Sequence, residues 1–275
     1  MRIVSLAPSN TEILYALGCG DMIVGNTIYC DYPEDAKKKE KVGSFMKVDV
    51  PKIVDLKPDV VMTSTFLQDE TAVQCKKAGL KVFHVDPKTL DHVFQSIMSI
   101  GEFVNRKSRA LKLVNEMRSG FLDVRTAVMK RQKIKVYCEE DPRPPRVSGN
   151  WVPKVIDIAG GISLWPEGEE SRPVSIAKVE TFDPDCIVLS LCGFGNRAKP
   201  DIVTKREDWH HLRAVREGKI FVIDDSLLNR PGPRLVEGAR ELAKIFEKVQ
   251  VICVSSLFRY TTNTNLIPQA LTRFF

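Results

Sequence analysis

A helix-and-strand signature that occurs twice constrains the fold of this chain more than any other feature. Residues 48–64 align without a gap with residues 174–190, and identical Val, Lys, Pro, Asp and Ser residues coincide. In each copy a Pro-Asp turn ends a short stretch of helical spacing, because the residue before a proline disfavours the α region. An apolar run that indicates a buried strand follows. Two such units predict two similar lobes that face each other across a cleft.

Strand and helix periods alternate on both sides of a purely helical stretch. Residues 90–104 and 108–132 have helical periodicity, and only Gly120 weakens the second of them. A helix of about 25 residues is about 37 Å long, too long for a sheet crossover in a small domain. We therefore predict an α/β fold of two Rossmann-like lobes with parallel sheets, joined by a long backbone helix. The expected boundaries are 1–88 for the N-terminal lobe, 89–132 for the helical connector, 133–250 for the C-terminal lobe and 251–275 for a poorly packed tail without pattern.

The chain opens with a strand, a loop and a helix. Residues 2–6 are rich in β-forming side chains, and a run of helical spacing follows after a short break. Ser9 or Asn10 can cap this helix, and Glu12 stands three residues after Ser9, as in a capping box. The loop follows the carboxyl end of a strand, where open α/β sheets hold ligands. Ser9 and Asn10 are therefore candidate ligand contacts.

Charge and cysteine usage exclude several classes of protein. The net charge is +6, from 41 basic and 35 acidic residues, and the densest basic run, residues 37–41, also contains Glu40. This run indicates a solvated helix face rather than a nucleic-acid surface. No apolar stretch could span a membrane, and no leader precedes the first strand, so we expect no membrane insertion and a cytoplasmic location. The seven Cys have no CxxC spacing, as is typical of a reducing compartment.

Several motifs together resemble one known family. They are RIVSLAPSNTEILYALG at 2–18, YCDYP at 29–33, KIVDLKPDVV at 52–61, the long helix and RPGPRL at 230–235. They resemble the class III periplasmic-binding-protein family of iron-siderophore and cobalamin receptors, and within it the vitamin B12-binding proteins most. RVSGNWVPKVIDIAGG at 146–161, LCGF at 191–194 and NRPGPRLVEG at 229–238 resemble a branch of this family without a leader. The resemblance implies a ligand held in the cleft between two lobes.

The resemblance also implies roles for single positions. Tyr29 and Phe45 stand where the receptors have aromatic residues that contact the corrin, and such rings can stack on a flat macrocycle. Arg230 matches the first Arg of their R-x-x-P-R element. Ser64 stands where the receptors have a further cleft aromatic, so that ring is absent here.

This sequence departs from the family pattern at the positions through which such receptors dock onto their transporter. The receptors carry one Glu on the short helix of each lobe, which docks onto an ABC permease. Those positions are Pro51 and Ala177 in this chain. The missing carboxylates argue against an ABC permease as the partner.

Some candidate residues are open to two interpretations. Cys192 directly follows a strand and is either a soft-metal ligand or a tolerated thiol, and Phe194 in the same loop can offer a ring to a ligand. Trp151 begins a helix and is either a cleft aromatic or an anchor for that helix. Arg230 and Arg234 flank a rigid Pro-Gly-Pro, which suits recognition of a carboxylate, phosphate or amide-rich ligand, or a salt bridge at the start of the last helix.

The sequence lacks the common signatures of enzymes. There is no GxSxG, P-loop, HExxH or GxGxxG motif. The four His residues are scattered or adjacent, and we expect packing or surface roles for them rather than metal ligation. No catalytic residue and no metal site are therefore predicted.

We expect a soluble, non-enzymatic protein that binds a small molecule, cobalamin or another large metal chelate, between its lobes. One alternative is a cytosolic enzyme that acts on a corrinoid through Asp31, Cys192 and Asp225. A second alternative is an ABC-transporter substrate-binding component whose targeting segment is missing, and a third is a structural or regulatory protein that has lost its ligand. The expected ligand-binding residues are Ser9, Asn10, Tyr29, Asp31, Phe45, Ser64, Trp151, Cys192, Phe194, Asn229 and Arg230.

Overall fold

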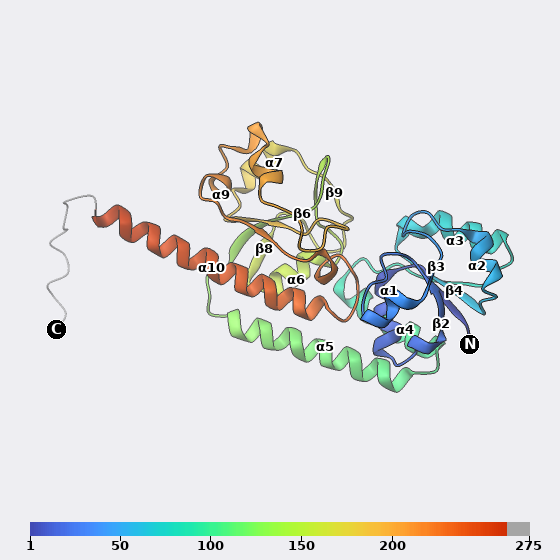
Figure 1. Ribbon diagram of the computed structural model, residues 1–275. Helices are drawn as coiled ribbons and strands as arrows, with labels where there is room; N and C mark the ends of the chain where they lie inside the picture. Colours follow the sequence, from blue (N-terminus) through green and yellow to red (C-terminus); the bar gives the residue numbers. More distant parts are fainter. Residues whose placement is uncertain (263–275) are drawn as a thin grey trace.

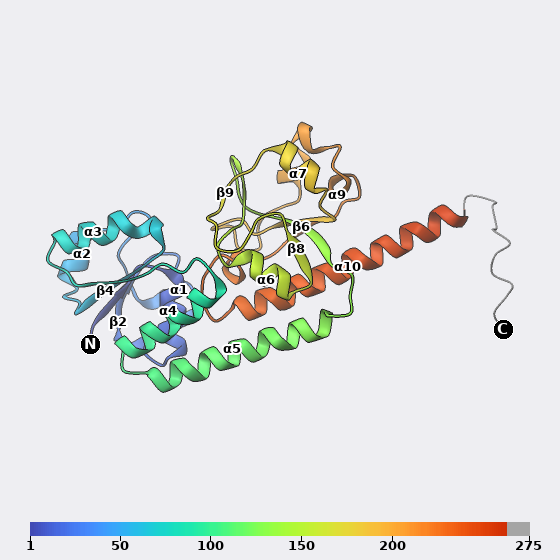
Figure 2. The same cartoon turned by 180° about the vertical axis from the view of Figure 1, so that it is seen from behind.

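The computed structural model describes residues 1–262, with side chains as far as Val251, and places two α/β lobes side by side along a long helix (Figures 1 and 2). The N-terminal sheet is parallel and has the strand order β3-β2-β1-β4-β5. All five residues of β4 are buried, as expected of a strand that is covered on both faces. The elements of this lobe are β1 Ile3–Ser5, α1 Pro8–Ala16, β2 Ile23–Asn26, β3 Glu40–Lys41, α2 Val50–Asp55, β4 Val60–Ser64, α3 Asp69–Lys77 and β5 Val82–Val85.

The C-terminal sheet is mixed, which corrects the expectation of a parallel sheet in this lobe. Its order is β11-β10-β6-β7-β9, with β8 paired to β6. β6 runs on to Pro142 and turns back into the antiparallel β7, so one half of the sheet is antiparallel. The elements of this lobe are β6 Ile134–Pro142, β7 Pro145–Val147, α6 Val152–Ile158, β8 Gly161–Ser163, β9 Arg172–Pro173, α7 Ile176–Phe182, β10 Cys186–Leu189, α8 Asp201–Thr204, α9 Arg213–Arg216 and β11 Ile220–Val222.

The repeated signature forms the same unit in both lobes. α2 leads into β4 and α7 leads into β10, and each short helix buries one apolar side chain, Ile53 or Val179. Lys57 and Asp183 occupy the same place in the two copies, directly before the proline, and both have a φ of +46°. In both copies, a residue in the left-handed conformation directly before the proline ends the helix. The α/β fold of two lobes expected from the repeat is confirmed.

Three long helices join and brace the lobes. They are α4 Leu90–Phe103, α5 Lys107–Val128 and α10 Leu235–Thr262. α10 lies alongside α5 in both views (Figures 1 and 2). α10 runs twelve residues past Gln250, so the expected loss of helical pattern at residue 251 is wrong for the backbone up to Thr262. The rest of the expected tail, residues 263–275, lies outside the described residues.

At Gly120, α5 packs tightly against α10. A Cβ atom at Gly120 would lie 2.6 Å from Cγ1 of Val236. We expect Gly120→Ala to lower the free energy of unfolding by about 1–3 kcal/mol, because overpacking outweighs the better helix propensity of alanine. Urea denaturation monitored by circular dichroism measures this. Ser119→Ala, on the exposed side of α5, is the control and should change stability little. A Gly120→Ala variant as stable as this control would contradict the tight packing of Gly120 against Val236.

Candidate functional site

A cavity of about 260 Å³ lies where the two lobes face each other. Its N-terminal wall follows the carboxyl ends of β1 and β4, and its C-terminal wall follows β10 and β11. This is the edge of an α/β sheet at which ligands bind. The lining residues are Pro8, Ser9, Tyr29, Phe45, Ser64, Thr65, Cys192, Gly193, Asp225, Asn229, Arg230 and Pro231.

The first turn of α1 forms part of the N-terminal wall, but not as a capping box. The helix begins at Pro8, and its N-cap is Ala7, which makes no side-chain hydrogen bond. A proline suits this position, because it has no N–H group that needs a partner. Ser9 and Asn10 are therefore buried inside the helix, and Asn10 Nδ2 donates to the Thr63 carbonyl at 3.0 Å. Ser9 lines the cavity, whereas Asn10 lies behind the wall and ties α1 to β4.

The end of β4 presents two hydroxyl groups at the cavity. Ser64 Oγ and Thr65 Oγ1 are buried and have no hydrogen-bond partner in the structure. Thr65 has a φ of +60°, a conformation that is unusual for a β-branched residue and is typical of functional sites. A bound ligand could satisfy both oxygens, which makes them candidate polar contacts.

Gln68 braces this wall, although no sequence pattern pointed to it. Its Oε1 accepts from the Ser64 amide at 2.8 Å, and its Nε2 donates to the carbonyls of Leu6 at 3.0 Å and Phe45 at 2.9 Å. One fully buried side chain therefore positions three segments of the wall.

Aromatic and apolar side chains surround the mouth of the cavity on the N-terminal lobe. Tyr29 is 44% exposed, and its ring faces Gly193, where an added Cβ atom would lie 4.0 Å from Tyr29 Cε1. Phe45 is half-buried beside it. Four more exposed apolar residues lie on loops at the strand ends of this lobe: Ile28, Met46, Phe66 and Leu67. Such a surface can cover the face of a flat ligand that is larger than the cavity.

Two polar residues fix the loop that forms the C-terminal wall. Asp225 is buried and accepts hydrogen bonds from the Gly193 amide at 3.0 Å and the Gly195 amide at 2.6 Å. Asn229 Nδ2 donates to the Ser190 carbonyl at 2.7 Å and to Cys192 Sγ at 3.1 Å. Their side chains therefore hold the loop in place.

The Cys192 thiol is at the edge of the cavity and is uncharged. Desolvation raises its pKa to about 12, and the negative charges of Glu140 and Asp225 act in the same direction. Burial likewise raises the pKa of Glu140 to about 7. Because the thiolate is the nucleophile, a protonated Cys192 is poorly suited to nucleophilic attack.

An inter-lobe ion cluster, formed by Glu12, Asp31, Arg230 and Arg234, closes one side of the cavity. Arg234 donates to both oxygens of Glu12, at 2.6 and 2.9 Å. Arg230 Nη1 lies 3.0 Å from Glu12 Oε1 and 2.6 Å from Asp31 Oδ1. The sequence pointed to Arg230 and Arg234 but not to Glu12 as their partner, because Glu12 is in the other lobe.

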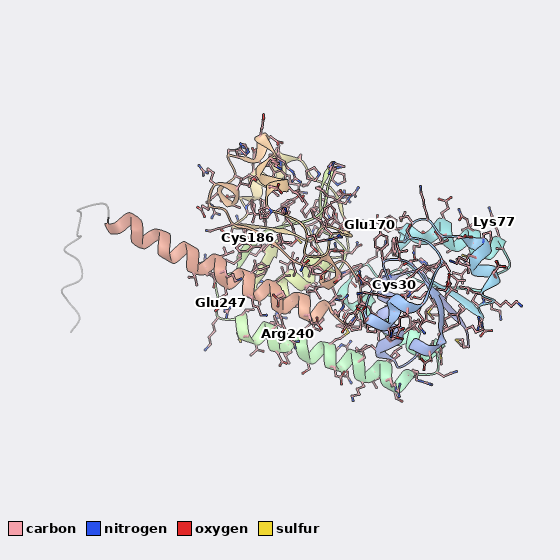
Figure 3. The ribbon with its side chains drawn as sticks, in the orientation of Figure 1. Cys30, Lys77, Glu170, Cys186, Arg240 and Glu247 are labelled. Atoms are coloured by element: carbon pink, nitrogen blue, oxygen red, sulfur yellow. The ribbon has the colours of Figure 1, made fainter. Side chains whose placement is uncertain are left out.

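A second set of polar contacts joins the lobes. Lys88 Nζ lies 2.9 Å from Glu170 Oε1, and Glu167 Oε1 accepts from the Leu90 amide at 2.9 Å. Figure 3 labels Glu170 where the C-terminal lobe faces the N-terminal lobe. Direct contacts therefore connect the lobes at more than one place in this conformation.

The structure brings seven of the eleven expected ligand-binding residues to the cavity and leaves four outside its lining. Trp151 is buried, and its Nε1 donates to the Leu228 carbonyl at 2.7 Å, so it anchors the start of α6. Phe194 is 37% exposed beside the cavity, and Asp31 meets Arg230 at its edge. Asn10 is the fourth, behind the wall. The lining residues that were not expected as ligand contacts are Pro8, Thr65, Gly193, Asp225 and Pro231.

The described residues do not assemble a metal centre. No group of three or more His, Cys, Asp or Glu side chains among them could hold a metal ion. His84 instead bonds to Thr63 Oγ1 at 2.8 Å, and His210 bonds to the Thr204 carbonyl at 2.8 Å.

Comparison with known proteins assigns this chain and its fold to one family. Residues 3–227 match the periplasmic binding protein family. The chain belongs to this family. It is 33% identical, over 88% of its length and 79% of the relative, to the uncharacterized ABC transporter substrate-binding lipoprotein YvrC of Bacillus subtilis. It is 27% identical to a vitamin B12-binding protein of Vibrio cholerae over 90% of each chain. The solved periplasmic heme-binding protein RhuT of Roseiflexus is 26% identical, with a TM-score of 0.78 over 90% of this chain and 98% of that one.

Membership of the family confirms the expectation of a binding protein rather than an enzyme. It does not support the two expectations that set the chain apart from transport. One relative is named as a lipoprotein of an ABC transporter, so Pro51 and Ala177, both exposed near the starts of α2 and α7, do not argue against a permease partner. The names of the relatives also give no support to a cytoplasmic location. In the part of the chain that the structure describes, no helix is long and apolar enough to cross a membrane.

Proposed function

We propose that this chain is the substrate-binding component of an ABC transporter outside the cytoplasm, and that it holds a corrinoid in the cleft between its lobes. The relatives YvrC and the vitamin B12-binding protein support the transport role. The observation that carries the choice of ligand is the chemistry of the cavity. Aromatic rings and two free hydroxyl groups line its N-terminal side, and a loop held by hydrogen bonds lines its C-terminal side.

The charge of the cavity favours a ligand without net negative charge. Arg230 and Asp225 are the charged side chains of its lining, and their formal charges cancel. Arg230 is moreover already paired with two carboxylates. A corrinoid, with amide groups around a metal-bearing macrocycle, suits such a lining better than a haem, whose two carboxylates require positive charge.

The size of the cavity requires the lobes to separate or the ligand to project from it. Its volume of about 260 Å³ lies below the roughly 300–1,000 Å³ typical of pockets for small molecules. The part of a macrocycle outside the cavity would lie against Ile28, Met46, Phe66 and Leu67, which are exposed and follow or precede the lining residues Tyr29, Phe45 and Thr65 in the sequence. Wider opening would break the contacts between Lys88 and Glu170.

Binding of corrinoids by the purified protein tests this function. Cyanocobalamin and dicyanocobinamide are titrated against the protein with absorbance and thermal unfolding as readouts, and haemin is titrated in parallel. We expect corrinoids to raise the unfolding temperature, since a ligand at 100 times its Kd stabilises the folded state by about 2.7 kcal/mol. Stabilisation by haemin alone would show that the ligand is a haem and not a corrinoid. Absence of a response to all three compounds would reject the proposed ligand class.

A further inference from the structure

The four residues of the inter-lobe ion cluster are not equivalent. Glu12 is 2% exposed and is held by both nitrogens of the Arg234 fork, while Arg230 and Arg234 are each 13% exposed. Asp31 differs, because its side chain is 49% exposed at the edge of the cleft. Glu12 and Arg234 thus form a buried pair, and Asp31 is the solvent-accessible partner of Arg230.

Arg230 is the one member of the cluster that lines the cavity beside the aromatic residues. Its shortest ion-pair contact is with Asp31 Oδ1, at 2.6 Å from Nη1. A carboxylate or phosphate on a ligand would be drawn to the same guanidinium, because Arg pairs well with such groups. Such a ligand group would have to displace the carboxylate of Asp31, which is part of the protein and therefore has a high effective concentration at Arg230.

The charge state of Asp31 suits this competition. Burial acts to raise the pKa of its carboxyl group, but the hydrogen bond and the charge of Arg230 outweigh burial and lower the pKa. Asp31 is therefore ionised at neutral pH, and the four charges of the cluster sum to zero.

We propose that Asp31 determines the specificity of the cleft: by neutralising Arg230 at the cavity wall, it selects against ligands that carry a net negative charge and leaves the cleft to ligands without one. The proposal rests on the proposed function, because it takes the cavity to be the ligand site. It gives Asp31 a role other than direct contact with a ligand or catalysis. If Asp31 only joined the two lobes, replacing it would change the affinity for all ligands alike.

The test compares two macrocycles of different charge, haemin with its two carboxylates and cyanocobalamin with no net charge. Asp31→Asn removes the charge of the side chain, Asp31→Glu keeps it, and Asp123→Asn removes an exposed carboxylate of α5 away from the cleft. We expect Asp31→Asn to shift the ratio of the two affinities towards haemin by roughly tenfold or more, as one uncompensated charge near a protein surface implies. Asp31→Glu and Asp123→Asn should keep the ratio of the unmodified protein.

A second measurement does not depend on the identity of the natural ligand. Sulfate is compared with chloride at equal ionic strength in thermal unfolding of the same four proteins. In Asp31→Asn, Arg230 keeps Glu12 as a partner but the ion cluster has a net charge of +1. This variant should therefore bind sulfate and give an additional rise of roughly 2 °C or more in the unfolding temperature relative to the three others. Because Arg230 keeps its ion pair with Glu12 and the replaced side chain is half exposed, the variant is expected to fold.

The outcomes separate this proposal from the proposed function. If neither macrocycle binds to any variant but sulfate stabilises Asp31→Asn selectively, the corrinoid function fails and the role of Asp31 at Arg230 stands. If Asp31→Asn weakens both macrocycles equally, or if it responds to sulfate like Asp123→Asn, Asp31 only joins the lobes and the proposal is overturned.

Discussion

Replacing Glu12 by Gln is expected to lower the free energy of unfolding by about 3–5 kcal/mol, because it leaves a buried arginine without its counter-charge. Glu12 accepts both hydrogen bonds of the Arg234 fork and a third from Arg230. Arg234 would keep its contact to Ser226 Oγ at 3.1 Å, the ring of Tyr32 4.2 Å away and one amide oxygen of the new side chain, but it would lose its bidentate carboxylate partner. Chemical denaturation at neutral pH, followed by circular dichroism, measures the loss.

Glu237→Gln is the matched control for this change. Glu237 is on α10, one turn from Arg234, and its side chain is exposed, so the same substitution should change stability by less than about 0.5 kcal/mol. Equal stability of the Glu12→Gln and Glu237→Gln variants would show that the inter-lobe ion cluster does not contribute to holding the lobes together.

Removing both rings at the mouth of the cavity is expected to weaken corrinoid binding by about 100-fold. Tyr29 and Phe45 line the same wall, and neither is buried in the core of the lobe. Truncation of aromatic anchors in a binding site typically costs about 2 kcal/mol or more, and about 2.8 kcal/mol corresponds to a factor of about 100. Cyanocobalamin titration of the Tyr29→Ala, Phe45→Ala double variant gives the affinity directly.

Tyr32→Ala controls for loss of an exposed ring from the same loop. Tyr32 is 46% exposed and its ring lies over Arg234 rather than in the cavity. This variant should bind cyanocobalamin within about threefold of the unmodified protein, a difference below about 1 kcal/mol. The ligand would have to lie elsewhere if the double variant bound as well as Tyr32→Ala.

Local patterns in the sequence were sufficient to predict most of the site-bearing elements. The repeated signature at 48–64 and 174–190 correctly predicted a short helix followed by a buried strand in each lobe, because burial period, Pro-Asp turn and helix spacing are all properties of adjacent residues. The start of α1 was misplaced, because Ser9 and Asn10 are good capping residues but Pro8 in the first turn is compatible with an earlier start.

The antiparallel half of the C-terminal sheet was not predicted, for a related reason. β7 and β9 are three and two residues long, and their pairing depends on partners rather than on their own periodicity. Short strands of this kind carry too few residues to show an alternating pattern. The same holds for Gln68, which is an ordinary polar residue in the sequence and a brace for three segments in the structure.

The sequence by itself determined the two lobes, the long helices between them and the strand ends that line the cavity, because these follow from periodicity and turn chemistry over a few neighbouring residues. The tertiary structure alone decided which charges meet. Glu12 and Arg230 are 218 positions apart in the chain, and only the closure of one lobe onto the other brings them within 3.0 Å. Together with Asp31 and Arg234, this pair forms a cluster without net charge, because electrostatic energy depends on distance in space and not on separation along the chain.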